Sequence, residues 1–226
     1  MKADHKQPEY IEAMEAYLSG DRADAEKAVE SLIRKYPDDS SLLLLLGNIT
    51  YTLGRLGEAC AHYEKAIELE PGFCQAYFKL GVCYVRMGKL DQALRSFKKN
   101  VEAGCQGHVM SYYWMGLINS FLGNDDEARE AFTLLHEESK ESQLANFFLA
   151  QLLMRRNENE EALRLLQELL ALSPDFAEVH YLMGLVYSRM HKNMDAIRCF
   201  RRTLELNPED KRARMEFEQL VEVPSV

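Results

Sequence analysis

Residues that make tight turns are scarce in this chain of 226 residues, which has only 12 glycines and 6 prolines. A β-sandwich or barrel needs many tight turns and relies on these two residues to make them. The scarcity therefore argues against both folds. Hydrophobic residues make up 47% of the chain and charged residues 28%, close to the average for a soluble globular protein. Because this is enough apolar material to form a core, a largely disordered chain is excluded.

Long apolar segments and excess positive charge are also missing. No segment reaches the roughly 18 apolar residues of a membrane span, so we expect no membrane insertion. The first nine residues, MKADHKQPE, have no apolar core, and we expect no signal peptide. The net charge of −9 repels phosphate backbones, so we expect no nucleic-acid partner.

The five cysteines do not form a recognisable framework. Their number is odd, their spacing is scattered and no CxxC motif occurs. Free thiols in a reducing compartment fit this pattern, and together with the missing signal peptide they predict a cytoplasmic protein. The five are Cys60, Cys74, Cys83, Cys105 and Cys199.

Small residues recur along the chain at a spacing of 34. Such a period indicates a repeat architecture and is sought before any local pattern. One alanine series is Ala25, Ala59, Ala93, Ala128, Ala162 and Ala196, with a single step of 35. The chain accordingly divides into units 6–39, 40–73, 74–107, 109–142, 143–176 and 177–210, with His108 inserted.

Each recurring position in the unit has a physical role. Position 8 is Gly or Ala, which lets two helices cross closely, and position 20 is always Ala on the second helix, where we expect it to face the same crossing. Position 15 is Gly, Asn or His, residues that tolerate the left-handed backbone of a helix end. Acidic residues follow in the first turn of the second helix, where the helix dipole favours them. Apolar residues recur with a period of 3.6, so each unit is predicted to be a helix–turn–helix hairpin.

Taken together, these features resemble the tetratricopeptide repeat, whose unit has 34 residues. Unit 40–73, SSLLLLLGNITYTLGRLGEACAHYEKAIELEPGF, is a near-complete match. The resemblance implies an all-α fold, a right-handed α-solenoid of six hairpins that forms a single domain over residues 1–226. After the last unit, residues 209–221 carry Ala213, Phe217, Leu220 and Val221 on one stripe, which predicts a helix that caps the array.

Residues for catalysis, metals or cofactors are not apparent. Gly81 and Gly88-Lys89 superficially suggest a phosphate loop, but the spacing is wrong and both glycines have positions in the repeat. Cys105 and His108 could offer two metal ligands, whereas a structural zinc site wants four. We therefore expect a protein that is not an enzyme and has no cofactor.

The resemblance implies that the first helices line the concave side of the array, at unit positions 2, 5, 9 and 12. Five of the six residues at position 5 are aromatic. Two interpretations stay open: the rings grip a partner peptide, or they fill gaps between hairpins. The candidate residues are Tyr10, Tyr17, Asn48, Tyr51, Phe78, Tyr113, Phe147 and Tyr181.

A row of arginines adds a second candidate feature. Arg86, Arg155 and Arg189 all occupy unit position 13. They could meet carboxylates of a ligand, or they could merely complement the dipole at a helix C-terminus.

These residues predict a non-catalytic scaffold or adaptor that binds a partner peptide or protein in the concave groove. The alternatives are a self-assembling homo-oligomeric scaffold on a complex or organelle surface, and a chaperone for secreted or assembled subunits. Some family members grip a C-terminal carboxylate with Lys then Asn at positions 5 and 9. Here Leu44 precedes Asn48, which argues against that adaptor role.

Overall fold

A computed structural model describes residues 8–104, 109–139 and 143–222, and it includes their side chains except that of Glu222. The described residues form thirteen helices and no strand, which confirms the predicted all-α class. The helices are α1 (Pro8–Ser19), α2 (Arg22–Lys35), α3 (Ser40–Thr52), α4 (Leu56–Leu69), α5 (Cys74–Arg86), α6 (Leu90–Glu102), α7 (Val109–Leu122), α8 (Asp125–Glu138), α9 (Gln143–Arg155), α10 (Asn159–Leu172), α11 (Ala177–Arg189), α12 (Asn193–Leu206) and α13 (Lys211–Glu222).

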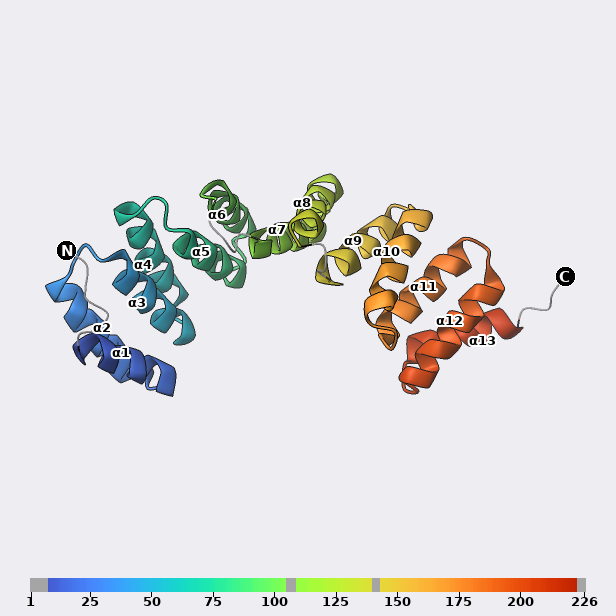
Figure 1. The fold of residues 1–226 in the computed structure, drawn as a ribbon, viewed down its shortest axis with the longest axis horizontal. Helices are drawn as coiled ribbons and strands as arrows, with labels where there is room; N and C mark the ends of the chain where they lie inside the picture. Colours follow the sequence, from blue (N-terminus) through green and yellow to red (C-terminus); the bar gives the residue numbers. More distant parts are fainter. Residues whose placement is uncertain (1–7, 105–108, 140–142, 223–226) are drawn as a thin grey trace. The chain divides into compact units, whose positions relative to one another are not determined.

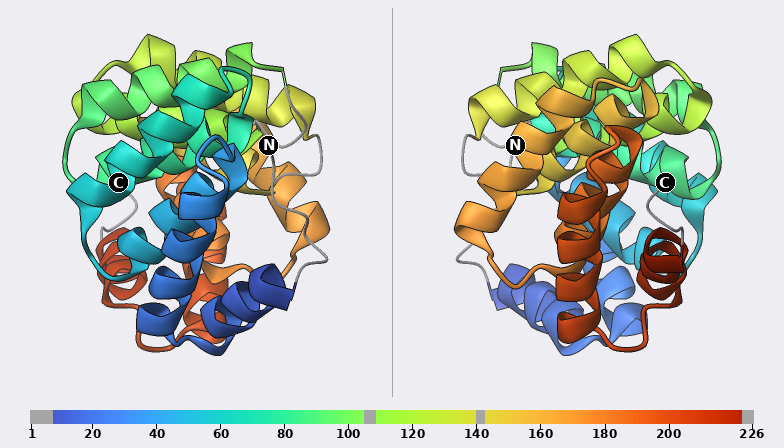
Figure 2. Two further views of the ribbon diagram at one scale, coloured as in Figure 1. Left: turned by 90° about the vertical axis from the view of Figure 1, so that its left-hand side faces the viewer. Right: turned by 90° about the vertical axis from the view of Figure 1, so that its right-hand side faces the viewer.

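The chain divides into two compact units, Met1–Ile118 and Asn119–Val226, and the boundary falls within α7. In the first unit, the pairs α1/α2, α3/α4 and α5/α6 pack as hairpins, and each hairpin packs on the next (Figure 1). In the second unit, α9/α10 and α11/α12 do the same, and α13 packs on α12 (Figure 2, right). This is an α-helical repeat solenoid, in which each hairpin buries its apolar side on its neighbours.

The two helices of a hairpin cross at the small residue of position 8. A Cβ atom added to Gly47 would lie 2.4 Å from the ring of Tyr63, and one added to Gly184 would lie 2.4 Å from Phe200. The ring comes from unit position 24, and its atoms are the three nearest to the added Cβ, so position 24 makes a closer contact than the alanine at position 20. Both rings are almost fully buried. The absence of a side chain on the first helix is therefore what admits an aromatic ring from the second.

Residue sizes at positions 8 and 24 vary together along the sequence. Where position 8 is Gly, as in Gly81, position 24 is aromatic, as in Phe97. Where position 8 is Ala, as in Ala150, position 24 is aliphatic, as in Leu166. The added methyl group is thus matched by a smaller partner, which keeps the volume of the crossing near constant.

The first helix of each hairpin ends in a left-handed residue at position 15, as predicted. Asn157 has φ 60° and His191 has φ 58°, and the glycines at the same position have φ between 72° and 86°. Each second helix then begins two residues later and carries acidic residues in its first turn, such as Asp24, Glu58 and Asp91. The sharp turn between the helices therefore depends on one backbone conformation that L-residues rarely adopt.

Neighbouring hairpins are joined by ion pairs of opposite polarity at equivalent unit positions. Arg55 at position 16 pairs with Glu26 at position 21 of the preceding hairpin. In the second unit the charges are exchanged, because Glu158 at position 16 pairs with Arg129 at position 21, 2.8 Å away. Half-exposed pairs contribute little free energy. Because the charges are exchanged, however, combining position 16 of one interface with position 21 of the other would place like charges together.

Asp210 directly precedes the cap helix α13, and its carboxylate accepts hydrogen bonds from the backbone N–H groups of Arg212 and Ala213 in the first turn. The Arg212 guanidinium lowers the pKa of Asp210. Ala213, Phe217 and Leu220 belong to the cluster around Phe200, as the predicted stripe requires. Val221 is 56% exposed, so the prediction that it faces the last hairpin is wrong. It lies one residue past Leu220, about 100° around the helix from the packed face.

The expectation of five free thiols is also wrong. Cys60, Cys83 and Cys199 are free, but Cys74 is disulfide-bonded. Scattered spacing does not exclude a pair, because a hairpin can bring together cysteines that are distant in sequence. Cys105 and the rest of the 105–108 segment, where two metal ligands were considered, lie outside the described residues.

We predict that Gly81→Ala lowers the free energy of unfolding by about 1–3 kcal/mol, because its Cβ would lie 2.7 Å from the Phe97 ring. Adding Phe97→Leu recreates the Ala150/Leu166 combination and should cost less than the sum of the two single substitutions. A double-mutant cycle by urea unfolding measures this coupling. Additive single effects would contradict the size matching.

A second prediction concerns the left-handed turn. His191→Gly should raise the free energy of unfolding by ~0.5–1 kcal/mol, because relief of the left-handed strain exceeds the entropy cost of glycine. Asn157→Gly should gain less, since asparagine tolerates this conformation better. His191→Ala is the control, because it retains the Cβ and should gain nothing. A gain for Ala equal to that for Gly would show that the imidazole, not the backbone, is responsible.

Candidate peptide-binding faces of the first helices

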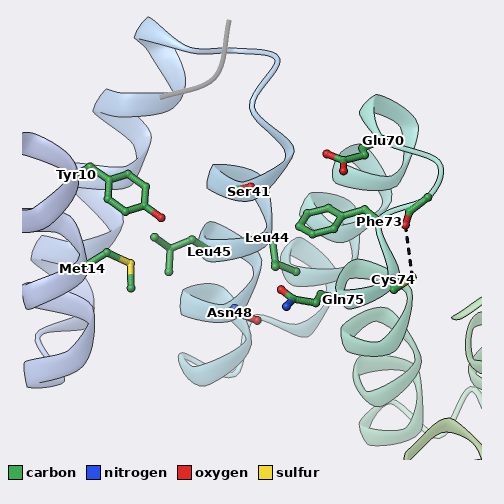
Figure 3. Close-up of a pocket in the computed structure, with 11 residues that line it drawn as sticks. Tyr10, Met14, Ser41, Leu44, Leu45, Asn48, Glu70, Phe73, Cys74 and Gln75 are labelled. Carbon is green, nitrogen blue, oxygen red and sulfur yellow. Dashed lines mark hydrogen bonds between the residues drawn. The ribbon is translucent and has the colours of Figure 1, made fainter. Parts of the chain in front are cut away.

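A pocket of about 520 Å³ lies on the first unit between α1, α3 and the start of α5 (Figure 3). Tyr10 and Met14 come from α1, where they lie one helical turn apart and so share a face. Leu44 and Asn48 stand in the same relation on α3. The full lining is Tyr10, Met14, Ser41, Leu44, Leu45, Asn48, Glu70, Gly72, Phe73, Cys74 and Gln75.

The walls of this pocket are mainly apolar, with polar groups spaced among them. Ser41, Asn48 and Gln75 supply a hydroxyl and two amides, and Glu70 is the one acidic residue in the lining. Its carboxylate accepts a hydrogen bond from the Ser40 hydroxyl at 2.5 Å. Burial, followed by the nearby carboxylate of Asp39, raises the pKa of Tyr10, so its hydroxyl stays protonated as a donor. Apolar walls with a few placed polar groups are typical of ligand sites.

Asn48 also lines a smaller pocket of about 160 Å³ on the same unit, together with Tyr17, Tyr51 and Lys79. The Tyr63 hydroxyl donates a hydrogen bond to the Asn48 Oδ1 atom at 3.0 Å. This bond fixes the amide orientation and leaves its N–H donors unused by Tyr63. The structure therefore places four of the predicted residues, Tyr10, Tyr17, Asn48 and Tyr51, on two pockets of one unit.

The remaining rings of the aromatic series are half-buried and contact other rings of the chain. Phe78 lies 5.8 Å from Phe97 between ring centroids, and Tyr181 lies 5.9 Å from Phe200. The Arg212 guanidinium of the cap covers Tyr181, 4.4 Å from its centroid. These rings therefore pack within the chain while part of each ring surface stays exposed to solvent.

Tyr113 and Phe147 show the same behaviour. Tyr113 contacts Trp114 edge-on at 5.6 Å. Phe147 contacts Phe148 at 5.5 Å and stacks on Phe176 at 5.8 Å. Neither interpretation of the series is excluded by such contacts, because a half-buried ring can serve both packing and binding.

The position-13 arginines bind the end of the first helix of the preceding hairpin. Arg86 Nη1 donates to the Tyr51 carbonyl oxygen at 3.4 Å and lies 5.1 Å from the Tyr51 ring. Arg189 Nη1 donates to the Met154 carbonyl oxygen at 2.6 Å. Arg155 Nη2 donates to the Ser120 hydroxyl at 2.6 Å. The contacts of Arg86 and Arg189 with helix-end carbonyl oxygens fit the dipole interpretation, and none of the three arginines uses every donor of its guanidinium in these contacts.

Sequence reasoning missed the side of the first pocket formed by the segment before α5. Phe73 lines it and lies outside the unit positions assigned to the inner face, whereas Gln75, at the start of α5, lies at position 2 of its unit but was not named among the candidates. A signal was present, because Phe73 and Phe176 are aromatic residues at the last position of their units. A simple connecting turn would favour Gly, Pro, Asn, Asp or Ser at such a position.

In the part of the chain that the structure describes, no group of three His, Cys, Asp or Glu side chains could hold a metal ion. None of the described helices combines the length and apolarity that a bilayer-spanning helix requires.

Comparison with known families places this geometry in context. Models described as "TPR repeat" match residues 47–88 and 150–190, and models described as "Tetratricopeptide repeat" match 177–210, 75–103 and 111–135. The chain is 28% identical over 138 residues to Anaphase-promoting complex subunit 3 of Schizosaccharomyces pombe, covering 61% of this chain and 21% of that protein. It is 26% identical over 172 residues to the Protein STIP1 homolog of Dictyostelium discoideum, covering 73% and 29%.

Among solved structures, the chain is similar to YrrB, "a TPR protein with an unusual peptide-binding site". The TM-score is 0.74 and the identity 22%, over 84% of this chain and 98% of YrrB. The crystal structure of MamA protein gives a TM-score of 0.69 at 20% identity, over 83% and 97%. At these identities the likeness concerns the fold. The chain spans less than a third of the length of the two curated relatives named above.

We predict that Phe78→Ala lowers the thermal unfolding midpoint, because it removes the contact with Phe97 at a cost of ~2 kcal/mol. Phe78→Leu should cost less, since it retains most of the packed volume. Differential scanning calorimetry of the full chain compares the two. An unchanged midpoint in Phe78→Ala would mean that the ring does not support the hairpin and is free for another role.

Proposed function

Because this chain belongs to the tetratricopeptide-repeat family, we propose that it is a non-catalytic scaffold or adaptor. It binds a segment of another protein on the inner faces of its first helices. The proposal treats residues 1–226 as one solenoid domain. Arrays of this kind use extended surfaces of neighbouring first helices to hold a partner.

The observation that supports the proposal most is the 520 Å³ pocket of the first unit. It is built by α1, α3 and the start of α5, so it exists only where consecutive hairpins are stacked. Its volume is large enough for two or three side chains of a bound segment. Leu44 and Leu45 offer apolar contact, and the Asn48 and Gln75 amides can bond to a backbone.

Relatives give the proposal its wider setting. Two of the similar proteins are named as subunits of the anaphase-promoting complex, and one similar structure is described as having a peptide-binding site. These descriptions belong to those proteins. For this chain they support a role in protein interaction, while the identity of the partner is a matter for experiment. Self-assembly and a chaperone role stay predictions of the sequence.

The test is a selection of random 12-residue peptides, displayed on phage, against the immobilised full chain. A selected peptide is then titrated by fluorescence anisotropy into the chain and two variants. We expect Gln75→Trp to weaken binding at least about tenfold, because the indole fills the pocket. Gln167→Trp, an equal change on the exposed side of α10, should leave affinity within about twofold.

The contrast between these variants decides the result. Equal loss in both variants, or no loss in either, would contradict binding at the first-unit pocket. Circular dichroism of each variant confirms that helix content is unchanged.

A further inference from the structure

A second pocket, of about 260 Å³, lies wholly within the second unit between α9, α11 and the end of α7. Its apolar part comes from Phe148, Met154 and Leu182. Its polar part includes the guanidinium groups of Arg155 and Arg189 and the amide of Gln151. None of the described residues that line it is acidic. In a chain with net charge −9, two cationic side chains on one small pocket are unusual.

Arg189 contributes a positive charge that no described carboxylate neutralises. In the ranges 8–104, 109–139 and 143–222 no carboxylate forms an ion pair with it. Its contact there is the hydrogen bond to the Met154 carbonyl oxygen at 2.6 Å. A guanidinium has five N–H donors in a fixed plane, so several remain after this bond. The bond also holds the side chain in place, which reduces the entropy lost when a ligand binds.

Arg155 is partly neutralised but keeps donors available. Its Nη2 atom contacts Ser120 at 2.6 Å and Asp125 at 2.9 Å, and its side chain is 49% exposed. Because both contacts use one nitrogen, the Nη1 and Nε donors are not engaged by these two residues. Arg155 and Arg189 occupy the same unit position on adjacent hairpins and line one pocket, so their free donors can converge on one anion.

The pocket of the first unit differs in charge. Of the described residues that line it, Glu70 is acidic and none is arginine or lysine. An anionic ligand is therefore disfavoured in the first pocket and favoured in the second. Arginine pairs bind carboxylates with particular strength, since a planar guanidinium can form two parallel hydrogen bonds to one carboxylate.

We propose that the second-unit pocket binds the side-chain carboxylate of an Asp or Glu in a partner peptide, with a neighbouring apolar residue against Phe148 and Leu182. This inference rests on the proposed function and adds the chemistry of the partner. An internal acidic side chain suits the pocket better than a chain end. The half-buried residues of the inner face continue past it on α9 and α11, to Phe147 and Tyr181, so that a bound segment can extend beyond the pocket.

The test uses the same peptide library, displayed so that each peptide has no free carboxyl terminus. Selection is carried out on the Gln75→Trp chain, in which the first pocket is filled. We expect the selected peptides to be enriched in Asp or Glu next to a large apolar residue. A selected peptide is then synthesised with an amidated end and titrated at low and high NaCl, where affinity should fall as salt rises.

Matched variants test whether Arg155 and Arg189 bind the acidic residue of the peptide. Arg189→Gln and Arg155→Gln should each weaken the amidated peptide about tenfold or more, the effect of losing one charged hydrogen bond. Arg164→Gln, the same charge change on an exposed part of α10, should leave affinity within about twofold. Replacing the acidic residue of the peptide by its amide should weaken binding to the wild type, and have little further effect on Arg189→Gln.

Several results would overturn the inference. Selected peptides without acidic enrichment, or peptides bound equally well by Arg189→Gln and the wild type, would contradict it while leaving the proposed function intact. Binding that requires a free terminal carboxylate, in place of the side-chain acid, would also contradict it. If neither the wild type nor the Gln75→Trp chain selects any peptide, the proposed function fails together with this inference.

Discussion

The close crossing of two helices within each hairpin is the constraint on which the rest of the structure depends. At Gly47, Gly81 and Gly184 there is no room for even one methyl group beside the ring of the second helix. Once the ring occupies this space, one side of each first helix is buried against its partner. The opposite side cannot enter the same crossing, and it becomes the surface that lines the pockets. The geometry of binding is therefore set by a packing requirement.

Stacking of hairpins adds a second layer to this arrangement. Arg86 and Arg189 each reach back to a carbonyl oxygen at the end of the preceding first helix, so the same contact recurs in both units. The Arg55–Glu26 and Glu158–Arg129 pairs repeat one contact with exchanged charges. Individually these interactions contribute little free energy. Together they help to set how consecutive hairpins lie against each other, and thus which side chains meet at a pocket.

The repeat made the fold predictable from the sequence, because local backbone requirements recur at fixed spacing. The left-handed residue at position 15 is an example: it marks every turn whether the residue is Gly, Asn157 or His191. The size relation between positions 8 and 24 was equally present in the sequence, yet only the alanine at position 20 was predicted to face the crossing. Positions 20 and 24 lie one turn apart on the second helix. Helical periodicity alone does not show which of them makes the closest contact with the small residue at position 8.

The candidate site was less predictable, for a different reason. Tyr10, Asn48 and Tyr51 were named from unit positions that describe first helices, and they line pockets. Phe73 belongs to the junction between hairpins, whose path depends on tertiary packing. Gln75 lies at the start of α5, at a unit position assigned to the inner face, but it was not named. The partners of the arginines lie about one full repeat away, so a charge row in the sequence does not show which donors are used. Cys74 is a comparable case, since cysteine spacing does not reveal its disulfide.

The central claim is that partners bind on the first helices. Hydrogen–deuterium exchange of the full chain, with and without a saturating selected peptide, tests it most directly. The account predicts added protection in first helices, in α1, α3 and α5 or in α9 and α11. The exposed sides of second helices such as α4 and α10 should be unchanged. Protection confined to second helices, or spread evenly over both helices of every hairpin, would contradict it.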